Sequence, residues 1–176
     1  MKPNVRRLVL AALCLALALV LPFLTGQIPQ IGSMLSPMHI PVLLCGFVCG
    51  WPYGLAVGAI APILRSLLFS MPPMFPAAIG MAFELAAYGL VAGLLYKLLP
   101  KKPGWLYVEL VIAMVLGRVV WGGARYLMAG LSGGEFPLSA FFAGAVTSAI
   151  PGIVLQIVLV PILVMALEKA KLVSND

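Results

Sequence analysis

Long apolar stretches, separated by short polar or glycine- and proline-rich stretches, run through the whole chain. A helix rises about 1.5 Å per residue, so about 20 apolar residues cross the hydrocarbon core of a bilayer. The pattern therefore predicts six membrane-spanning helices, over 7–25, 39–50, 53–70, 77–98, 106–129 and 141–167. The second stretch is short, and the helix-breaking residues GWPYG (50–54) follow it. Residues 39–70 are thus either a full hairpin or one helix with a half-crossing.

Composition supports this interpretation. The chain has 176 residues, of which 63% are hydrophobic and only 9% are charged. A soluble domain has about 25% charged residues, so this chain lacks the polar surface to dissolve in water. The sequence predicts one all-α domain over 1–176, a bundle embedded in the lipid bilayer.

The basic residues are distributed unevenly between the two sides of the predicted bundle. Eight of the eleven fall on one side, and they are Lys2, Arg6, Arg7, Lys97, Lys101, Lys102, Lys169 and Lys171. The connections on the other side, 26–38, 71–76 and 130–140, contain no Lys or Arg. Because cytoplasmic loops carry an excess of Lys and Arg, both termini are predicted to be cytoplasmic. The same bias explains the basic isoelectric point, so nucleic-acid binding is not indicated.

Four ionisable side chains remain deeper in the predicted spans, namely Arg65, Glu84, Arg118 and Arg125. An arginine at the centre of a bilayer costs about 2.5–3.5 kcal/mol on insertion scales, so such residues face the bundle interior and pair with one another. Arg118 and Arg125 lie seven residues apart, close to two helical turns, and so share one helix face. We expect one of the arginines to pair with Glu84, and the outer-loop residue Glu135 is near enough in sequence to reach Arg125.

Two interpretations of these arginines stay open. In one, they line a pocket that opens to the outside and binds an anionic or strongly hydrogen-bonding small molecule. In the other, they only stabilise the bundle by donating to carbonyls where helices are broken. Glu109 lies near the predicted cytoplasmic end of its span, where we expect it to reach water.

Several neighbours are suited to a pocket. Trp121 lies three residues after Arg118, Tyr88 is one turn from Glu84, and His39 opens the second predicted span. Gln156 lies midway along the last span. Core packing or anchoring at the membrane interface is an alternative role for each of them. The outer connections, 26–38, 70–76 and 131–139, are rich in Pro, Gly and Met or Phe, and are suited to covering such a pocket.

Other chemistry is poorly supported. Cys45 and Cys49 share one helix face, but with only His39 nearby they provide too few ligands for a metal site, and no cofactor is predicted. Asp176 is the only aspartate, and the chain has no Walker A motif with which to hydrolyse ATP. An intramembrane enzyme would have only His39 with Ser33 or Ser36 for its chemistry. A small binding bundle that obtains energy from a partner is favoured, and a self-sufficient channel or small transporter stays as an alternative.

The chain resembles the substrate-binding S components of energy-coupling factor (ECF) transporters, which import vitamins in bacteria. Three features carry the resemblance. Ala12 and Ala16 are spaced by four residues in AALCLALAL, after a basic N-terminus. The block SPMHIPVLLCGFVCGWPYGLAVGAIAPILRSLLF (36–69) is similar to the first loop and the second and third spans of the family. The third feature is the compact chain of six predicted spans with both ends inside.

The resemblance implies a high-affinity binding subunit that needs a separate module for energy. Its substrate would bind in the outer half of the bundle, under the first loop. Ala12 and Ala16 would dock on a transmembrane coupling subunit, which carries two cytoplasmic ATPases. Small residues allow such close helix approach in lipid.

The substrate is inferred from charge. The pocket motifs of the riboflavin and thiamine members are absent. Excess positive charge favours a carboxylate- or phosphate-bearing ligand, because arginine binds such groups through two hydrogen bonds. Pantothenate is the favoured substrate, with cobalamin or another vitamin as alternatives. Arg118 and Arg125 would clamp its anionic group, with Arg65 and Glu84 as a supporting pair.

Overall fold

The computed structural model describes residues 5–25 and 34–170. These residues fold almost entirely into helices, and the described part contains no strand, so the all-α prediction is confirmed. The elements in chain order are α1 (Val5–Val20), η1 (Leu21–Thr25), α3 (His39–Cys49), α4 (Trp51–Phe69), η2 (Met74–Ala78), α5 (Ile79–Leu98), α6 (Pro103–Leu131), α7 (Leu138–Phe142), η3 (Ala143–Thr147) and α8 (Ile150–Lys169).

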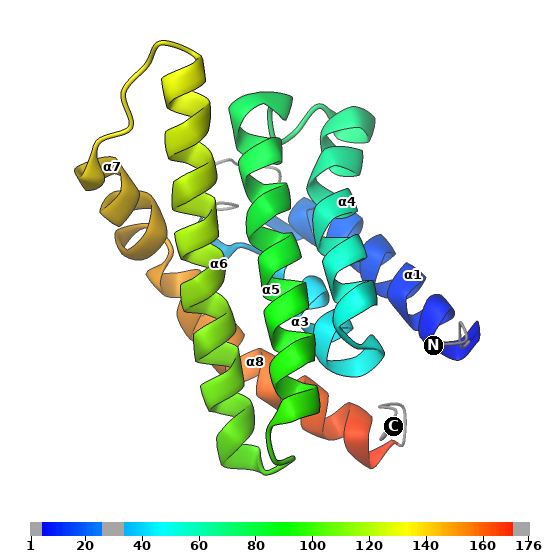
Figure 1. The fold of residues 1–176 in the computed structure, drawn as a ribbon. Coiled ribbons are helices and arrows are strands. Elements are labelled where there is room, and N and C mark those ends of the chain that lie inside the picture. The colour runs from blue at the N-terminus through cyan, green and yellow to red at the C-terminus, as the bar shows by residue number, and fades with distance from the viewer. Residues whose placement is uncertain (1–4, 26–33, 171–176) are drawn as a thin grey trace.

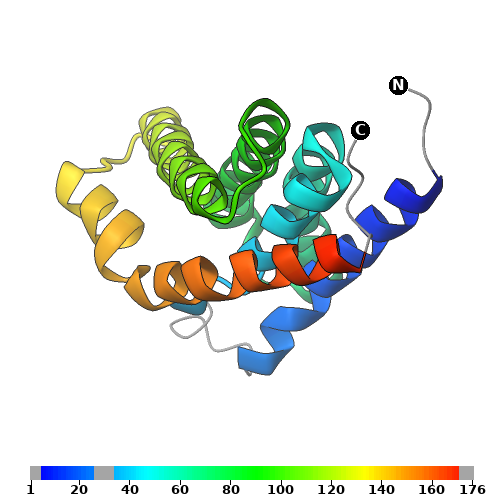
Figure 2. The ribbon, with the colours of Figure 1, turned by 90° about the horizontal axis from the view of Figure 1, so that it is seen from below.

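The helices form two layers. Helices α4, α5 and α6 stand side by side in one row (Figure 1). Seen from below, this row is viewed almost end-on, and α8 runs across one side of it together with α1 (Figure 2). The short helix α3 lies between the layers and packs against α1, α4, α5 and α8. His39, the first residue of α3, is therefore buried at the centre of the bundle.

Five helical segments are long and apolar enough to cross a membrane, and they are Val5–Leu24, Trp51–Phe69, Met74–Leu98, Pro103–Leu131 and Ile150–Lys169. The chain is therefore a multi-pass membrane protein, but six full crossings are not confirmed. Helix α3 has 11 residues, which gives a length of about 16 Å, half of what a crossing needs. All its residues are buried by protein, as expected of a half-crossing that must hide its ends from lipid.

The last predicted span, 141–167, is not one straight helix. Helix α7 leads into a wider π-helical turn, η3, and the chain then bends before α8 begins at Ile150. In Figure 1 the start of α1, the α5–α6 connection and the end of α8 lie toward one end of the bundle. This arrangement is compatible with both termini on one side. Which side faces the cytoplasm stays a prediction from the basic residues.

Glycines allow α4 and α5 to approach each other unusually closely. A Cβ atom added to Gly54 would lie 2.6 Å from the carbonyl oxygen of Gly89, well inside van der Waals contact. A Cβ on Gly58 would overlap the backbone of Leu85. Helices in lipid lack a hydrophobic driving force for association. Small residues at such crossings allow the close van der Waals packing that holds the helices together instead. Helices α4 and α5 are therefore closely packed, and Glu84 lies on α5.

We expect Gly89→Ala to destabilise the protein by about 1–3 kcal/mol, because its Cβ would overlap the Gly54 backbone and force the helices apart. Thermal unfolding in detergent measures the change. Gly123→Ala is the matched control, since a Cβ there has no atom within 4 Å. That control should leave stability unchanged or increase it slightly. Equal destabilisation by both variants would show that the close crossing is not responsible.

Candidate functional site

Three ionisable side chains from three helices meet at the centre of the bundle. Glu84 on α5 lies 2.9 Å from the guanidinium of Arg118 on α6, measured from Oε1 to Nη1. The same oxygen lies 3.2 Å from Nε2 of His39, the first residue of α3. We call Glu84, Arg118, His39 and the adjacent Tyr88 the central cluster.

Local sequence explains how Tyr88 joins the central cluster. It lies one helical turn after Glu84 on α5, so both side chains project toward α6. Gly117 of α6 has no side chain to obstruct it, and the Tyr88 ring fills the space that a Cβ would take. The ring also meets His39 edge-on, with centroids 5.2 Å apart. The Tyr88 hydroxyl lies beside Glu84 without forming a well-aligned hydrogen bond.

The central cluster is almost completely removed from solvent. Glu84 is 1% exposed, His39 3% and Tyr88 0%. Charges are strongly disfavoured in such a place unless they are paired, and Arg118 supplies the compensating positive charge. Gln156 is 1% exposed on α8, which packs against α3, and neither polar atom of its side chain has a hydrogen-bond partner. Unpartnered buried groups of this kind are available to a polar ligand.

Arg125 occupies a second position, two turns along α6 from Arg118. Its side-chain stem lies against Gly80 of α5, since a Cβ there would be 3.2 Å from Arg125 Cδ. Its guanidinium lies over the rings of Trp121, at 5.9 Å from the centroid, and Phe136, at 5.6 Å. No carboxylate of the described residues forms an ion pair with it. The expected approach of Glu135 is therefore not observed.

Arg65 lies apart from the central cluster. It is 3% exposed and donates a hydrogen bond to the carbonyl oxygen of Leu19. Its guanidinium lies over Phe23, at 4.8 Å from the ring centroid, and over Phe69, at 5.3 Å. The predicted Arg65–Glu84 pair is wrong, because α3 and α6 supply the partners of Glu84 instead. In this structure Arg65 fastens α4 to the end of α1.

We expect Arg65→Gln to lower the free energy of unfolding by about 1.5–3 kcal/mol, the range for hydrogen bonds to charged groups. Ligand affinity should change less than about threefold, since the side chain touches none of the central cluster. Unfolding and binding measured on one preparation separate the two effects. A large loss of affinity without loss of stability would return Arg65 to the binding site.

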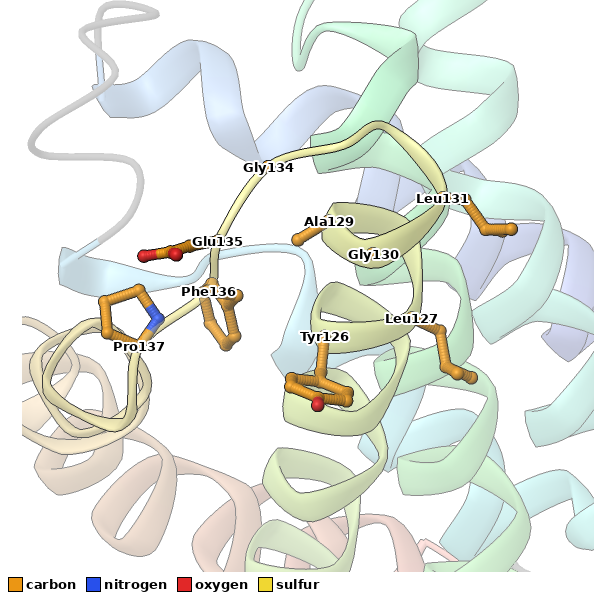
Figure 3. Close-up of a pocket in the computed structure, with 9 residues that line it drawn as sticks. All are labelled: Tyr126, Leu127, Ala129, Gly130, Leu131, Gly134, Glu135, Phe136 and Pro137. Carbon is orange, nitrogen blue, oxygen red and sulfur yellow. The ribbon is translucent and has the colours of Figure 1, made fainter.

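A hollow of about 520 Å³ lies at the far end of α6. Figure 3 shows it between the last turns of this helix, at Tyr126 and Leu131, and the chain that returns through Glu135, Phe136 and Pro137. Its lining is mainly apolar and open, whereas the buried polar groups lie deeper, in the central cluster. We therefore place the candidate site at the central cluster and Arg125. Phe136 belongs to both regions, because its ring also contacts Trp121.

A second polar group forms at the opposite end of the bundle. Tyr96 donates a hydrogen bond to Glu168, and Lys101 lies 5.4 Å from the Tyr96 ring. Glu109 lines the same cavity of about 40 Å³ and is 1% exposed. The expectation that Glu109 reaches water is therefore wrong, because α5 and α8 cover it.

Ala12 and Ala16 are exposed on the outer face of α1, whereas Ala11 and Ala18 on the other face are buried. The pair with four-residue spacing is thus available to another helix. Residues 26–33 of the long first connection lie outside the described residues. That this connection covers the pocket therefore stays a prediction. Among the described residues, no group of three or more His, Cys, Asp or Glu is placed to hold a metal ion.

The sequence indicated the members of the central cluster but not how they pair. His39 and Glu84 are 45 positions apart, and neither belongs to a spaced motif. The usable signal was that each is an isolated ionisable residue in an apolar run, which must find a partner in the bundle. The second polar group was missed because Glu109 and Glu168 both lie near helix ends, where water is the default partner.

The family model for the substrate-specific component of ECF transporters matches residues 6–164. The match covers all five long helical segments in whole or in large part, and all members of the central cluster. No curated protein and no solved structure matches the chain significantly.

Proposed function

Since the chain belongs to the substrate-specific components of ECF transporters, we propose that its central cluster and Arg125 form the substrate site for uptake of a vitamin. Members of this family are membrane-embedded binding subunits that work with a separate ECF module. The binding role therefore follows from membership. We propose in addition where the site lies, which residues form it and which ligand it binds.

One observation carries the proposal. The central cluster places a carboxylate, a guanidinium, an imidazole and a phenol where α3, α5 and α6 meet. All of these residues except Arg118 are 3% exposed or less. Desolvated polar groups strengthen hydrogen bonds to a ligand that reaches them. Trp121 and Phe136 next to Arg125 add apolar surface. A few convergent polar groups with aromatic walls are typical of small-molecule sites.

Pantothenate is the substrate we favour, in preference to cobalamin or another vitamin. It carries one carboxylate together with an amide and two hydroxyl groups. Arg125 is available to a carboxylate, and Tyr88 and Gln156 offer unpartnered hydrogen-bonding atoms. A vitamin whose polar groups do not meet these buried atoms would leave them without partners, which costs about 1–3 kcal/mol for each.

For the partner surface we propose the exposed face of α1. Ala12 and Ala16 present a shallow strip there, on a helix that packs on α3 and α4 with its other face. A helix of the transmembrane coupling subunit can approach such a strip closely. Two cytoplasmic ATPases bound to that subunit would drive release of substrate inside the cell. The bacterial plasma membrane is the proposed location, with the basic connections on the cytoplasmic side.

Native mass spectrometry of the protein purified in detergent from rich medium tests the binding role and the ligand. We expect one small molecule per chain, which matches pantothenate after release. Another vitamin would keep the binding role and replace the ligand. A protein that is empty, and stays empty when vitamins are added, would contradict the proposed site.

A further inference from the structure

The two arginines of α6 differ in their electrostatic state. Arg118 is neutralised, because Glu84 lies 2.9 Å away and is itself enclosed. Arg125 has the rings of Trp121 and Phe136 beside its guanidinium and no ion pair with a described carboxylate. A second anion would therefore be repelled by Glu84 at the Arg118 position, whereas it would be attracted at Arg125. The site is not a symmetrical two-arginine clamp.

We propose that the ligand is an elongated monoanion held in one direction, with its carboxylate at Arg125 and an uncharged hydroxyl- or amide-bearing end at the central cluster. This inference rests on the proposed function and adds the charge, the length and the orientation of the substrate. Among the described residues, Arg125 is the arginine of the site without an ion pair, so it favours one negative charge on the ligand. A ligand with two or more charges, such as a phosphate ester, would leave charge uncompensated.

The spacing sets the length of the ligand. Arg118 and Arg125 are seven residues apart on one helix, which corresponds to about 10 Å along the axis. On the facing helix, Gly80 lies against Arg125 and Glu84 against Arg118. Gly80 and Glu84 are only four residues apart, about 6 Å along the axis, so the two positions lie about 6–10 Å apart. A ligand that reaches both positions is therefore an extended chain rather than a single compact ring. Trp121 lies between the two positions, where its ring can cover an apolar middle section.

The uncharged end is assigned from the donors and acceptors of the central cluster. Glu84 can only accept hydrogen bonds when ionised, so it favours hydroxyl or amide N–H groups over another carboxylate. The Tyr88 hydroxyl has no partner of its own and can either donate or accept. A ligand hydroxyl can therefore bridge Glu84 and Tyr88.

Two probes that differ only at one end test this orientation. Pantothenate and pantothenol share their hydroxyl and amide groups, but pantothenol carries a primary alcohol in place of the carboxylate. The protein freed of ligand should bind pantothenate more tightly by about ten- to a hundredfold, the range for a hydrogen bond to a charged group. Isothermal titration in detergent measures both affinities.

Matched variants assign the preference to one arginine. Arg125→Gln should bind both probes about equally, at the affinity of the parent protein for pantothenol, and Arg125→Lys should keep part of the preference. Tyr88→Phe should weaken both probes by the same factor, since it acts on the shared end. Arg65→Gln should leave the ratio unchanged, because Arg65 lies apart from the site. Thermal unfolding of each variant excludes loss of fold as the cause.

The outcomes separate this inference from the proposed function. A preference that survives in Arg125→Gln overturns the orientation while leaving the binding role intact. If neither probe binds, the charge of the molecule that copurifies with the parent protein tests the inference. A neutral or multiply charged molecule overturns it. A copurified monoanion that is lost in Arg125→Gln supports it. A parent protein that neither copurifies nor binds any vitamin refutes the proposed function itself.

Discussion

Replacing Glu84 by glutamine should lower the free energy of unfolding by about 3–5 kcal/mol, the cost of leaving one member of a buried ion pair uncompensated. The carboxylate is 1% exposed and faces Arg118 at 2.9 Å and His39 at 3.2 Å. A glutamine amide keeps the size of the side chain but removes the charge that balances Arg118. Substrate affinity should fall by about tenfold or more, since the ligand also loses a charged acceptor.

The double variant Glu84→Gln, Arg118→Gln separates pairing from simple loss of two polar groups. Removing both charges leaves no unpaired ion of this pair. The double variant should therefore lose less stability than the sum of the losses in the two single variants. Unfolding of all four proteins in one detergent gives the coupling energy. Additive losses would contradict the ion pair as the reason for burying these residues.

The second large effect concerns the exposed strip of α1. Ala16→Trp should reduce vitamin uptake in a reconstituted system at least about tenfold, equivalent to about 1.4 kcal/mol of lost docking free energy. We expect this loss of uptake because an indole ring on this strip prevents the close approach of the partner helix. Binding of the vitamin by the isolated protein should be unchanged, because Ala16 is exposed on α1, whereas the central cluster lies on α3, α5 and α6.

Val119→Trp is the control for this variant. Val119 is 58% exposed on α6, a helix on the other side of the bundle from α1 (Figure 1). A tryptophan there places the same indole ring at an exposed position without touching the proposed docking strip. Equal loss of uptake in both variants would contradict a specific role for Ala12 and Ala16.

Much of the fold could be predicted because lipid imposes a simple rule on sequence. Apolar runs of sufficient length gave the five long segments, since every backbone group in lipid must bond within its helix. A hairpin and a half-crossing stayed open for residues 39–70, because a short apolar run does not reveal whether protein or lipid covers it. The bend before Ile150 was not predicted, since the apolar pattern continues through it.

The site was predictable in its residue types rather than in its pairs. Isolated charges in apolar runs identified Glu84 and the arginines, because each must face the interior. Which arginine would meet Glu84 depended on how α3, α5 and α6 are arranged in space. Arg65 shows the difficulty, since carbonyl and aromatic partners satisfy an arginine as well as a carboxylate does. Sequence pattern does not distinguish these partners.

Uptake of a labelled vitamin into liposomes tests the account most directly. The chain is reconstituted alone, and in parallel with the coupling subunit and both ATPases, with ATP supplied on the ATPase side. We predict stoichiometric binding without accumulation for the chain alone, and ATP-dependent accumulation only with the complete module. Accumulation by the chain alone, without ATP, would contradict a binding subunit and show a self-sufficient transporter.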